Sequence, residues 1–320
     1  GKVWELHYLG ASYIAVHFDF IVPRSGEYLR ISDPSGMQSY VIEQGRKTRS
    51  SNPQTSFWAK HVKGDTMIIE LMSEHDHLGT TFRIDEIGLG DPNIGNEEAL
   101  VYDDCQGSDR KNAKCYSDTT VYPQYAAAQA VARLLIQGAW LCTGWLASDD
   151  NHLITNYHCI DSDLQAYNTD YEFMAETPTC NEGKDYAVIK LPAETEPNAN
   201  DGGPSTHYDY LRFDMDLKTI PTDSAGDQQF RDLCQGMEIY IPQHCAGWDK
   251  MLGIESTHSS EPMNSRCHVS GWYTAGCTAS SGYYEVGYYC DTLGGSSGSP
   301  VITMREEDGY HQVIALHHCG

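Results

Sequence analysis

The feature that most constrains the fold is a succession of short apolar stretches separated by turn residues. From Ile14 to Val22, apolar side chains recur at every second position, which is the period of a β-strand. Pro23 ends that stretch, and Asp33-Pro-Ser-Gly36 marks a turn after the next one. Strand and helix patterns do not alternate along the chain, so a parallel sheet covered by helices is disfavoured. We therefore expect an all-β protein.

The chain has 320 residues, about twice a typical domain length, so two domains are expected. Residues 1–92 predict an N-terminal β-sandwich, with further strands around Leu29 and Ile31, on both sides of Lys63-Gly-Asp65, and over residues 82–87. Residues 93–123 are rich in Gly, Asn, Asp and Ser and are expected to form a linker or a surface arm.

Residues 124–320 are expected to form the second domain, which begins with a short helix over residues 126–135. Its strands are predicted at residues 140–146, 152–155, 186–191, 238–241, 301–304 and 313–316. Short strands without intervening helices fit a double barrel or a second sandwich.

The chain is strongly acidic, with 21 basic and 45 acidic residues and a net charge of -24. A nucleic acid or an anionic membrane would need a surface of the opposite sign, so we expect neither as a partner. No apolar run is long enough to span a bilayer. The acidity favours solubility, and it would also steer basic peptides toward the protein.

The chain contains 11 cysteines, scattered without the paired spacing of zinc fingers. This pattern predicts disulfides and an oxidising compartment, so we expect a secreted protein. Because the number is odd, one cysteine is free, pairs with another chain, or has lost its partner to truncation.

Three short segments carry side chains suited to nucleophilic catalysis. A predicted strand runs into His158, and Asp185 stands at the start of an apolar strand. The third segment is Gly294-Gly-Ser-Ser-Gly-Ser-Pro300, where glycines permit a tight turn with backbone N–H groups pointing at Ser297. Each signal is weak alone, but the order His, Asp, Ser in an all-β chain indicates a catalytic triad. A disulfide between Cys142 and Cys159 would fix the loop that presents the histidine.

These segments resemble the triad blocks of chymotrypsin-like serine endopeptidases. The similarity covers residues 101–320 and is strongest to the secreted microbial branch that includes lysyl and glutamyl endopeptidases, through Gly295-Ser-Ser-Gly-Ser-Pro300 and Ile314-Ala-Leu-His-His-Cys-Gly320. It implies a chymotrypsin-like double β-barrel that hydrolyses protein or peptide substrates as a monomer, without a cofactor. Residues 1–90 are loosely similar to CUB-like accessory sandwiches.

The resemblance also implies a role for each site residue. Ser297 attacks the scissile carbonyl, His158 moves the proton, and Asp185 orients the imidazole. The backbone N–H groups of Gly295 and Ser297 form the oxyanion hole. Animal trypsins have an aspartate where this chain has Ser296, and that aspartate pairs with a new N-terminus on activation. We expect no activation of that kind here.

Substrate specificity has two interpretations. Asp291 lies six residues before Ser297, where trypsins hold the carboxylate that binds Lys or Arg at the P1 position. Alternatively, this aspartate is an exposed loop residue. Thr292 and His317 resemble the pair that binds glutamate in glutamyl endopeptidases, but the neighbouring aspartate would repel that substrate. We therefore expect cleavage after Lys or Arg, with a Glu-specific endopeptidase as the alternative.

The resemblance to lysyl endopeptidases implies two further disulfides, Cys105–Cys319 and Cys115–Cys180. The chain departs from its relatives in two respects: the stretch between Cys159 and Asp185 is short, and the relatives continue beyond Gly320. We therefore expect that the C-terminus of the protease domain is truncated.

Other classes of protein fit less well. Gly294-x-Ser296-x-Gly298 matches the nucleophile elbow of α/β-hydrolases, but that fold needs its acid and histidine after the serine. Neither His158-Cys159 nor His317-His-Cys319 presents paired ligands, because adjacent residues of a strand point to opposite faces, so no metal site is expected. The remaining alternative is a catalytically inactive homologue that acts as a binding module.

Overall fold

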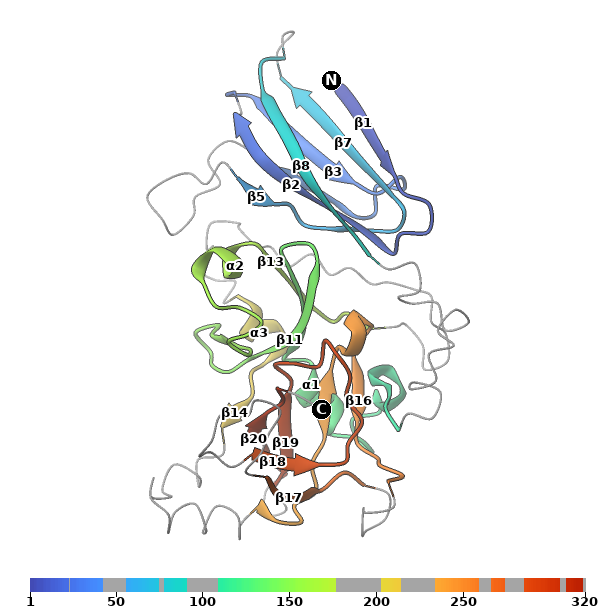
Figure 1. Cartoon of the computed structure of the whole chain (residues 1–320), viewed down its shortest axis with the longest axis vertical. Helices are drawn as coiled ribbons and strands as arrows, with labels where there is room; N and C mark the ends of the chain where they lie inside the picture. Colours follow the sequence, from blue (N-terminus) through green and yellow to red (C-terminus); the bar gives the residue numbers. More distant parts are fainter. Residues whose placement is uncertain are drawn as a thin grey trace. The chain divides into compact units, whose positions relative to one another are not determined.

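The computed structural model describes ten ranges of the chain, namely residues 1–22, 24–42, 56–74, 78–90, 109–176, 203–213, 234–258, 266–273, 285–305 and 309–318. Strands dominate these ranges, and the helices are short (Figure 1). The predicted all-β class is therefore confirmed. None of the described helices has the length and apolar character that a membrane crossing requires.

The chain forms two compact units. Unit 1 comprises Gly1–Ala99, Leu135–Trp140 and Asp161–Asp170, and unit 2 comprises Leu100–Leu134, Leu141–Ile160 and Tyr171–Gly320. The second unit contains both His158 and Ser297.

The strands of the N-terminal region form two antiparallel sheets. Its strands are β1 (Lys2–His7), β2 (Tyr13–Val22), β3 (Glu27–Ser32), β4 (Ser39–Ile42), β5 (Phe57–Trp58), β6 (Val62–Lys63), β7 (Thr66–Ser73) and β8 (Thr81–Leu89). One sheet has the order β1-β7-β3-β4, and the other has the order β5-β2-β6 with β8 also paired to β2. Apolar side chains from both sheets form one core, as predicted for a sandwich.

The sequence predicted β2, β3, β7 and β8, but it missed β1 and β4. Met67, Ile69 and Leu71 are buried at every second position of β7. β1 pairs with β7 but is almost entirely exposed, so its sequence lacks an apolar pattern. The turn predicted at Gly64 is present, and this glycine has a φ of +99°, which a residue with a side chain rarely adopts.

The remaining part of the chain contains further short strands and helices. The strands are β9 (Lys111–Asn112), β10 (Val131–Ile136), β11 (Trp140–Leu146), β12 (Leu153–Ile154), β13 (Thr169–Phe173), β14 (Arg212–Phe213), β15 (Ile241–Gln243), β16 (Met251–Gly253), β17 (Val269–Tyr273), β18 (Glu285–Tyr288), β19 (Pro300–Met304) and β20 (His311–Leu316). The α-helices are α1 (Gln124–Ala128), α2 (Asp163–Tyr167) and α3 (Pro204–Tyr208), and the 3-10 helices are η1 (Ala113–Tyr116) and η3 (Cys245–Gly247).

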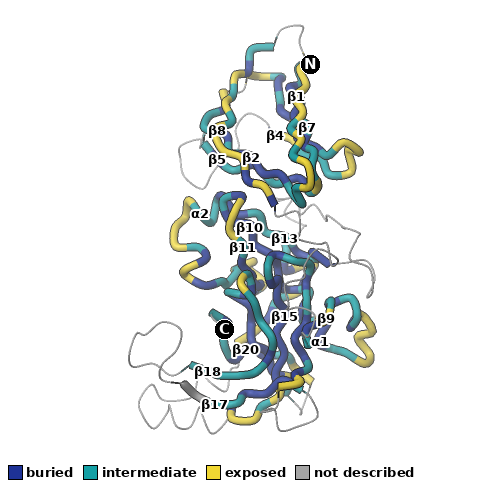
Figure 2. The backbone as a smooth tube through the Cα atoms, turned by 45° about the vertical axis from the view of Figure 1, so that its right-hand side comes forward, coloured by how far each residue is buried: buried dark blue, intermediate teal, exposed yellow. Residues whose placement is uncertain are grey.

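These strands are arranged in small open sheets. Their orders are β12-β11-β10-β13, β15-β16-β9, β14-β20-β19 and β17-β18. The strands predicted at residues 140–146, 301–304 and 313–316 correspond to β11, β19 and β20. The predicted strand at residues 186–191 lies outside the described residues. Figure 2 shows continuous burial along β15, which runs through the interior of unit 2.

The helix predicted over residues 126–135 is wrong beyond Ala128. α1 ends there, and Val131–Ile136 forms β10, in which every residue is buried. β10 lies between β11 and β13, so both of its edges are paired, and its side chains are buried on both faces. A strand covered on both faces has no alternating pattern, and its alanines and leucines are easily taken for a helix.

Candidate active site

His158 lies in a turn that follows β12. β12 is paired with β11 through Trp145 opposite Ile154. Beyond the histidine, Cys159 forms a disulfide with Cys142 of β11, with an S–S distance of 1.99 Å and a Cα–Cα distance of 6.3 Å. The turn is thus attached to β11 at both ends, and the histidine side chain remains exposed.

Ser297 lies in a tight turn that leads into β19. Gly295 and Gly298 both have left-handed backbone conformations, with φ of +93° and +92°. A Cβ atom at Gly298 would lie 2.0 Å from the carbonyl oxygen of Thr143, so only glycine fits there. The turn is therefore pressed against β11.

Thr143 connects the serine turn to the strand that presents the histidine. Its N–H donates to the carbonyl of Ser297 at 2.8 Å, and its hydroxyl donates to the carbonyl of Gly295 at 2.9 Å. Its own carbonyl accepts a hydrogen bond of 2.8 Å from the hydroxyl of Thr155. Adjacent residues of β11, Cys142 and Thr143, thus hold the loops of His158 and Ser297. Within the described residues, the side chains of His158 and Ser297 are not hydrogen-bonded to each other.

Two N–H groups of the serine turn make no hydrogen bond with the described residues. The N–H of Ser296 donates to Leu293, and that of Gly298 donates to His317, both at 2.9 Å. In the described part of the chain, the N–H groups of Gly295 and Ser297 have no acceptor. These are the groups that the sequence predicts as the oxyanion hole.

Ser296 is completely buried and has a neutral partner. Its hydroxyl donates to the side-chain oxygen of Gln243 at 2.6 Å, and the amide of that glutamine donates to the carbonyl of Asp291 at 2.9 Å. Gln243 was not predicted, because its role depends on a hydrogen bond to a residue 53 positions away.

Asp291 is partly buried, and residue 109 of the predicted arm binds its carboxylate. The N–H of Asp109 donates to Oδ2 of Asp291 at 2.7 Å. The carboxylate of Asp109 accepts a hydrogen bond of 3.0 Å from the hydroxyl of Thr257. Within the described ranges, Oδ1 of Asp291 has no hydrogen bond. Thr292, the next residue of the chain, is also partly buried.

His317 is buried beside the serine turn. The backbone N–H of His317 donates to the carbonyl of Ser299 at 2.9 Å. The hydroxyl of Tyr288 lies 2.6 Å from Nδ1 of the imidazole. Burial, together with repulsion from His318 and His158, lowers the pKa of His317 to about 4. Burial also raises the pKa of Tyr288, so its hydroxyl stays protonated. The imidazole of His317 is therefore neutral at neutral pH and shares a hydrogen bond with that hydroxyl.

Several predicted residues lie outside the described ranges. They are Asp185, Cys105, Cys180 and Cys319. Cys115, the predicted partner of Cys180, is disulfide-bonded. The described residues contain a further disulfide, Cys267–Cys290, that the sequence did not predict, and Cys290 directly precedes Asp291.

Comparison with known proteins adds two findings. The family model of the trypsin-like peptidase domain matches residues 142–309, slightly more than half of the chain. The secreted RxLR effector protein 73 of Plasmopara viticola is 31% identical over 350 aligned positions, which cover 97% of this chain and 75% of that protein. The matched range contains His158, Asp185 and Ser297.

Proposed function

The chain belongs to the trypsin-like peptidase family, and from this membership we propose that it is a serine endopeptidase. The observation that carries the proposal is the attachment of two loops to adjacent residues of β11. Cys142 is bonded to the residue after His158, and Thr143 is hydrogen-bonded to Ser297. A nucleophile and a base that exchange a proton must come within hydrogen-bond reach of each other, and anchoring both loops to one strand favours this.

In the proposed mechanism, Ser297 attacks the scissile carbonyl while His158 accepts its proton. His158 then protonates the leaving amine, and water hydrolyses the acyl-enzyme by the same route. Asp185 would hold the imidazole in the required tautomer. The N–H groups of Gly295 and Ser297 have no acceptor among the described residues, so they are available for the developing oxyanion.

We assign the P1 preference to Lys or Arg. Asp109 holds one carboxylate oxygen of Asp291 and thereby fixes the side chain, and the other oxygen has no partner among the described residues. A fixed carboxylate six residues before Ser297 would bind a basic side chain through a charge-assisted hydrogen bond. The net charge of -24 would further favour the approach of basic peptides.

The second candidate is cleavage after Glu, and the state of His317 favours it. In this candidate the hydroxyl of Tyr288 donates to Nδ1, so that the neutral imidazole presents an N–H donor on Nε2 for a carboxylate, together with Thr292. The charge of Asp291 would oppose a glutamate in the same pocket, which is why we rank this candidate second.

We further propose that the protein acts outside the cell. The relative from Plasmopara viticola is named as a secreted effector, and the disulfides Cys142–Cys159 and Cys267–Cys290 are typical of an oxidising compartment.

Labelling of the full chain with a fluorophosphonate tests the enzymatic proposal. We expect the reagent to modify Ser297, and we expect no labelling in Ser297→Ala and strongly reduced labelling in His158→Ala. Ser299→Ala is the matched control, because that serine lies in the same turn and should not be needed. If the folded wild type is not labelled, the protein is an inactive homologue that acts as a binding module.

A further inference from the structure

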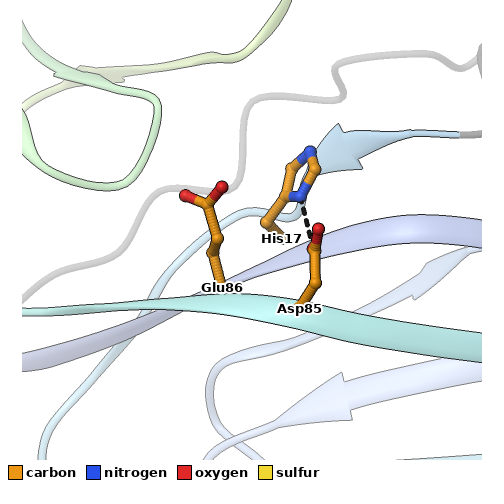
Figure 3. A group of neighbouring side chains, drawn as sticks. All are labelled: His17, Asp85 and Glu86. Carbon is orange, nitrogen blue, oxygen red and sulfur yellow. Dashed lines mark hydrogen bonds and ion pairs between the residues drawn. The ribbon is translucent and has the colours of Figure 1, made fainter.

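A histidine and two carboxylates lie together in unit 1, far along the sequence from the candidate active site. They are His17 of β2 and the neighbouring residues Asp85 and Glu86 of β8. One potential ligand atom from each residue lies within 4.8 Å of the other two. Figure 3 shows that all three side chains project to the same side of the sheet.

An irregularity in strand pairing creates this arrangement. Along a regular strand, Asp85 and Glu86 would point to opposite faces. In the β2–β8 pair, however, His17 is opposite Glu86 and Phe18 is opposite Ile84, which leaves Asp85 as an extra residue. Such a bulge redirects a side chain, and here it brings two consecutive carboxylates to the face of His17.

The hydrogen bonds of His17 suit a metal ligand. Its Nδ1 lies 2.6 Å from Oδ1 of Asp85, and its Nε2 lies 3.2 Å from the hydroxyl of Ser56. A histidine that binds a metal through one nitrogen normally donates its other N–H to a neighbouring group, and Ser56 can accept it.

Geometry and charge indicate which class of ion would bind. Ligand atoms around a zinc ion lie about 2.0–2.2 Å from the metal, so the three groups must move slightly closer than their present spacing. Glu86 is exposed and makes no hydrogen bond or ion pair with the described residues, so its side chain can rotate inward. An imidazole nitrogen favours a transition metal over Ca²⁺ or Mg²⁺. Two carboxylates would neutralise the charge of a divalent ion.

We propose that His17, Asp85 and Glu86 form a binding site for a divalent transition-metal ion of the zinc type, with water completing the coordination. The ion would join β2 to β8. It would thereby stabilise unit 1, because a ligand that binds only the folded state opposes unfolding.

Titration calorimetry with Zn²⁺ on the full-length protein tests this site, using Ser297→Ala as the parent to prevent self-cleavage. We expect saturable binding of one ion that Glu86→Gln weakens about 10-fold or more, since even outer-shell changes alter metal affinity 10–100-fold. Asp85→Asn and His17→Gln should weaken it similarly. The matched control is His7→Gln, because His7 lies 3.8 Å from Asp65 without a third ligand among the described residues, and Zn²⁺ binding should be unchanged.

Thermal unfolding provides a second measurement. Zn²⁺ should raise the Tm of the parent protein but not that of Glu86→Gln, and without metal the two should unfold at the same temperature. The proposal is overturned if the parent binds no Zn²⁺, or if all three variants bind it as tightly as the parent. It is also overturned if equimolar Ca²⁺ displaces Zn²⁺, because the site would then prefer a hard ion.

Discussion

The hydroxyl of Ser296 donates a hydrogen bond of 2.6 Å to the side-chain oxygen of Gln243, and neither side chain reaches solvent. The amide of the same glutamine donates to the carbonyl of Asp291 at 2.9 Å. One buried side chain thus supports two parts of the candidate site, the residue before Ser297 and the residue expected in the specificity pocket. Both groups of this hydrogen bond are neutral, so Ser296 does not need the charged N-terminus with which animal trypsins pair the aspartate at this position.

Gln243→Met should destabilise the protein and impair catalysis. The change leaves the hydroxyl of Ser296 and the carbonyl of Asp291 without their buried partner, which costs about 1–3 kcal/mol per group. We expect a lower free energy of unfolding in urea and a lower kcat, since the turn that holds Ser297 loses its support. Gln235→Met is the matched control: this exposed glutamine bonds to the carbonyl of Ser270, and the change should cost less than about 0.5 kcal/mol. Equal effects of the two variants would contradict the assigned role.

Asp291→Asn should reduce cleavage after Lys and Arg selectively. Asparagine keeps an oxygen that can accept the N–H of Asp109, so the loop should persist while the charge is lost. Loss of a charged hydrogen-bond partner costs about 1.5–3 kcal/mol, which corresponds to a decrease of about 10–100-fold in kcat/KM for basic substrates. A peptide library with all residues at P1 measures the change. Cleavage after Glu that His317→Gln abolishes would instead support the second candidate.

Removal of the Cys142–Cys159 disulfide should loosen the loop of His158. The bond closes a loop of 17 residues, so the double variant Cys142→Ala/Cys159→Ala should lose about 3 kcal/mol of stability. Fluorophosphonate labelling of Ser297 should slow at a temperature where the variant is still folded, because the base is no longer held against β11. Unchanged labelling in a destabilised variant would show that the disulfide has only a structural role.

The sequence predicted the parts of the structure that depend on local patterns. The alternation along β2 and the glycines around Ser297 are local signals, and they identified a strand and the serine turn. β10 was mistaken for a helix because all of its residues are buried, and a strand buried on both faces has no alternating pattern. The buried strands β11 and β19 were nevertheless predicted, so burial on both faces weakens the strand signal without removing it.

The sequence predicted only part of the candidate site, because the rest depends on contacts between residues far apart in the chain. Thr143 and Gln243 support the serine turn through hydrogen bonds between residues far apart in the sequence, and neither residue type is unusual. The group around His17 depends on a bulge that no local pattern indicates. Asp185 was predicted from order along the chain, lies outside the described residues, and stays a prediction.

Acid should destabilise the wild-type protein through His317. Burial lowers the pKa of this histidine from 6.5 to about 4, so between these values the unfolded chain binds a proton that the folded protein does not. The contribution of the neutral His317 to the free energy of unfolding is therefore fully present above pH 6.5 and is lost as the pH falls toward 4. Each unit of pKa difference corresponds to about 1.4 kcal/mol.

Urea unfolding of wild type and His317→Gln between pH 4 and 7 measures this effect. The stability difference between the two proteins should shrink as the pH falls, and His152→Gln, an exposed histidine, should leave the wild-type slope intact. A pH-independent difference would mean that the folded protein can accept the proton on His317 at little cost.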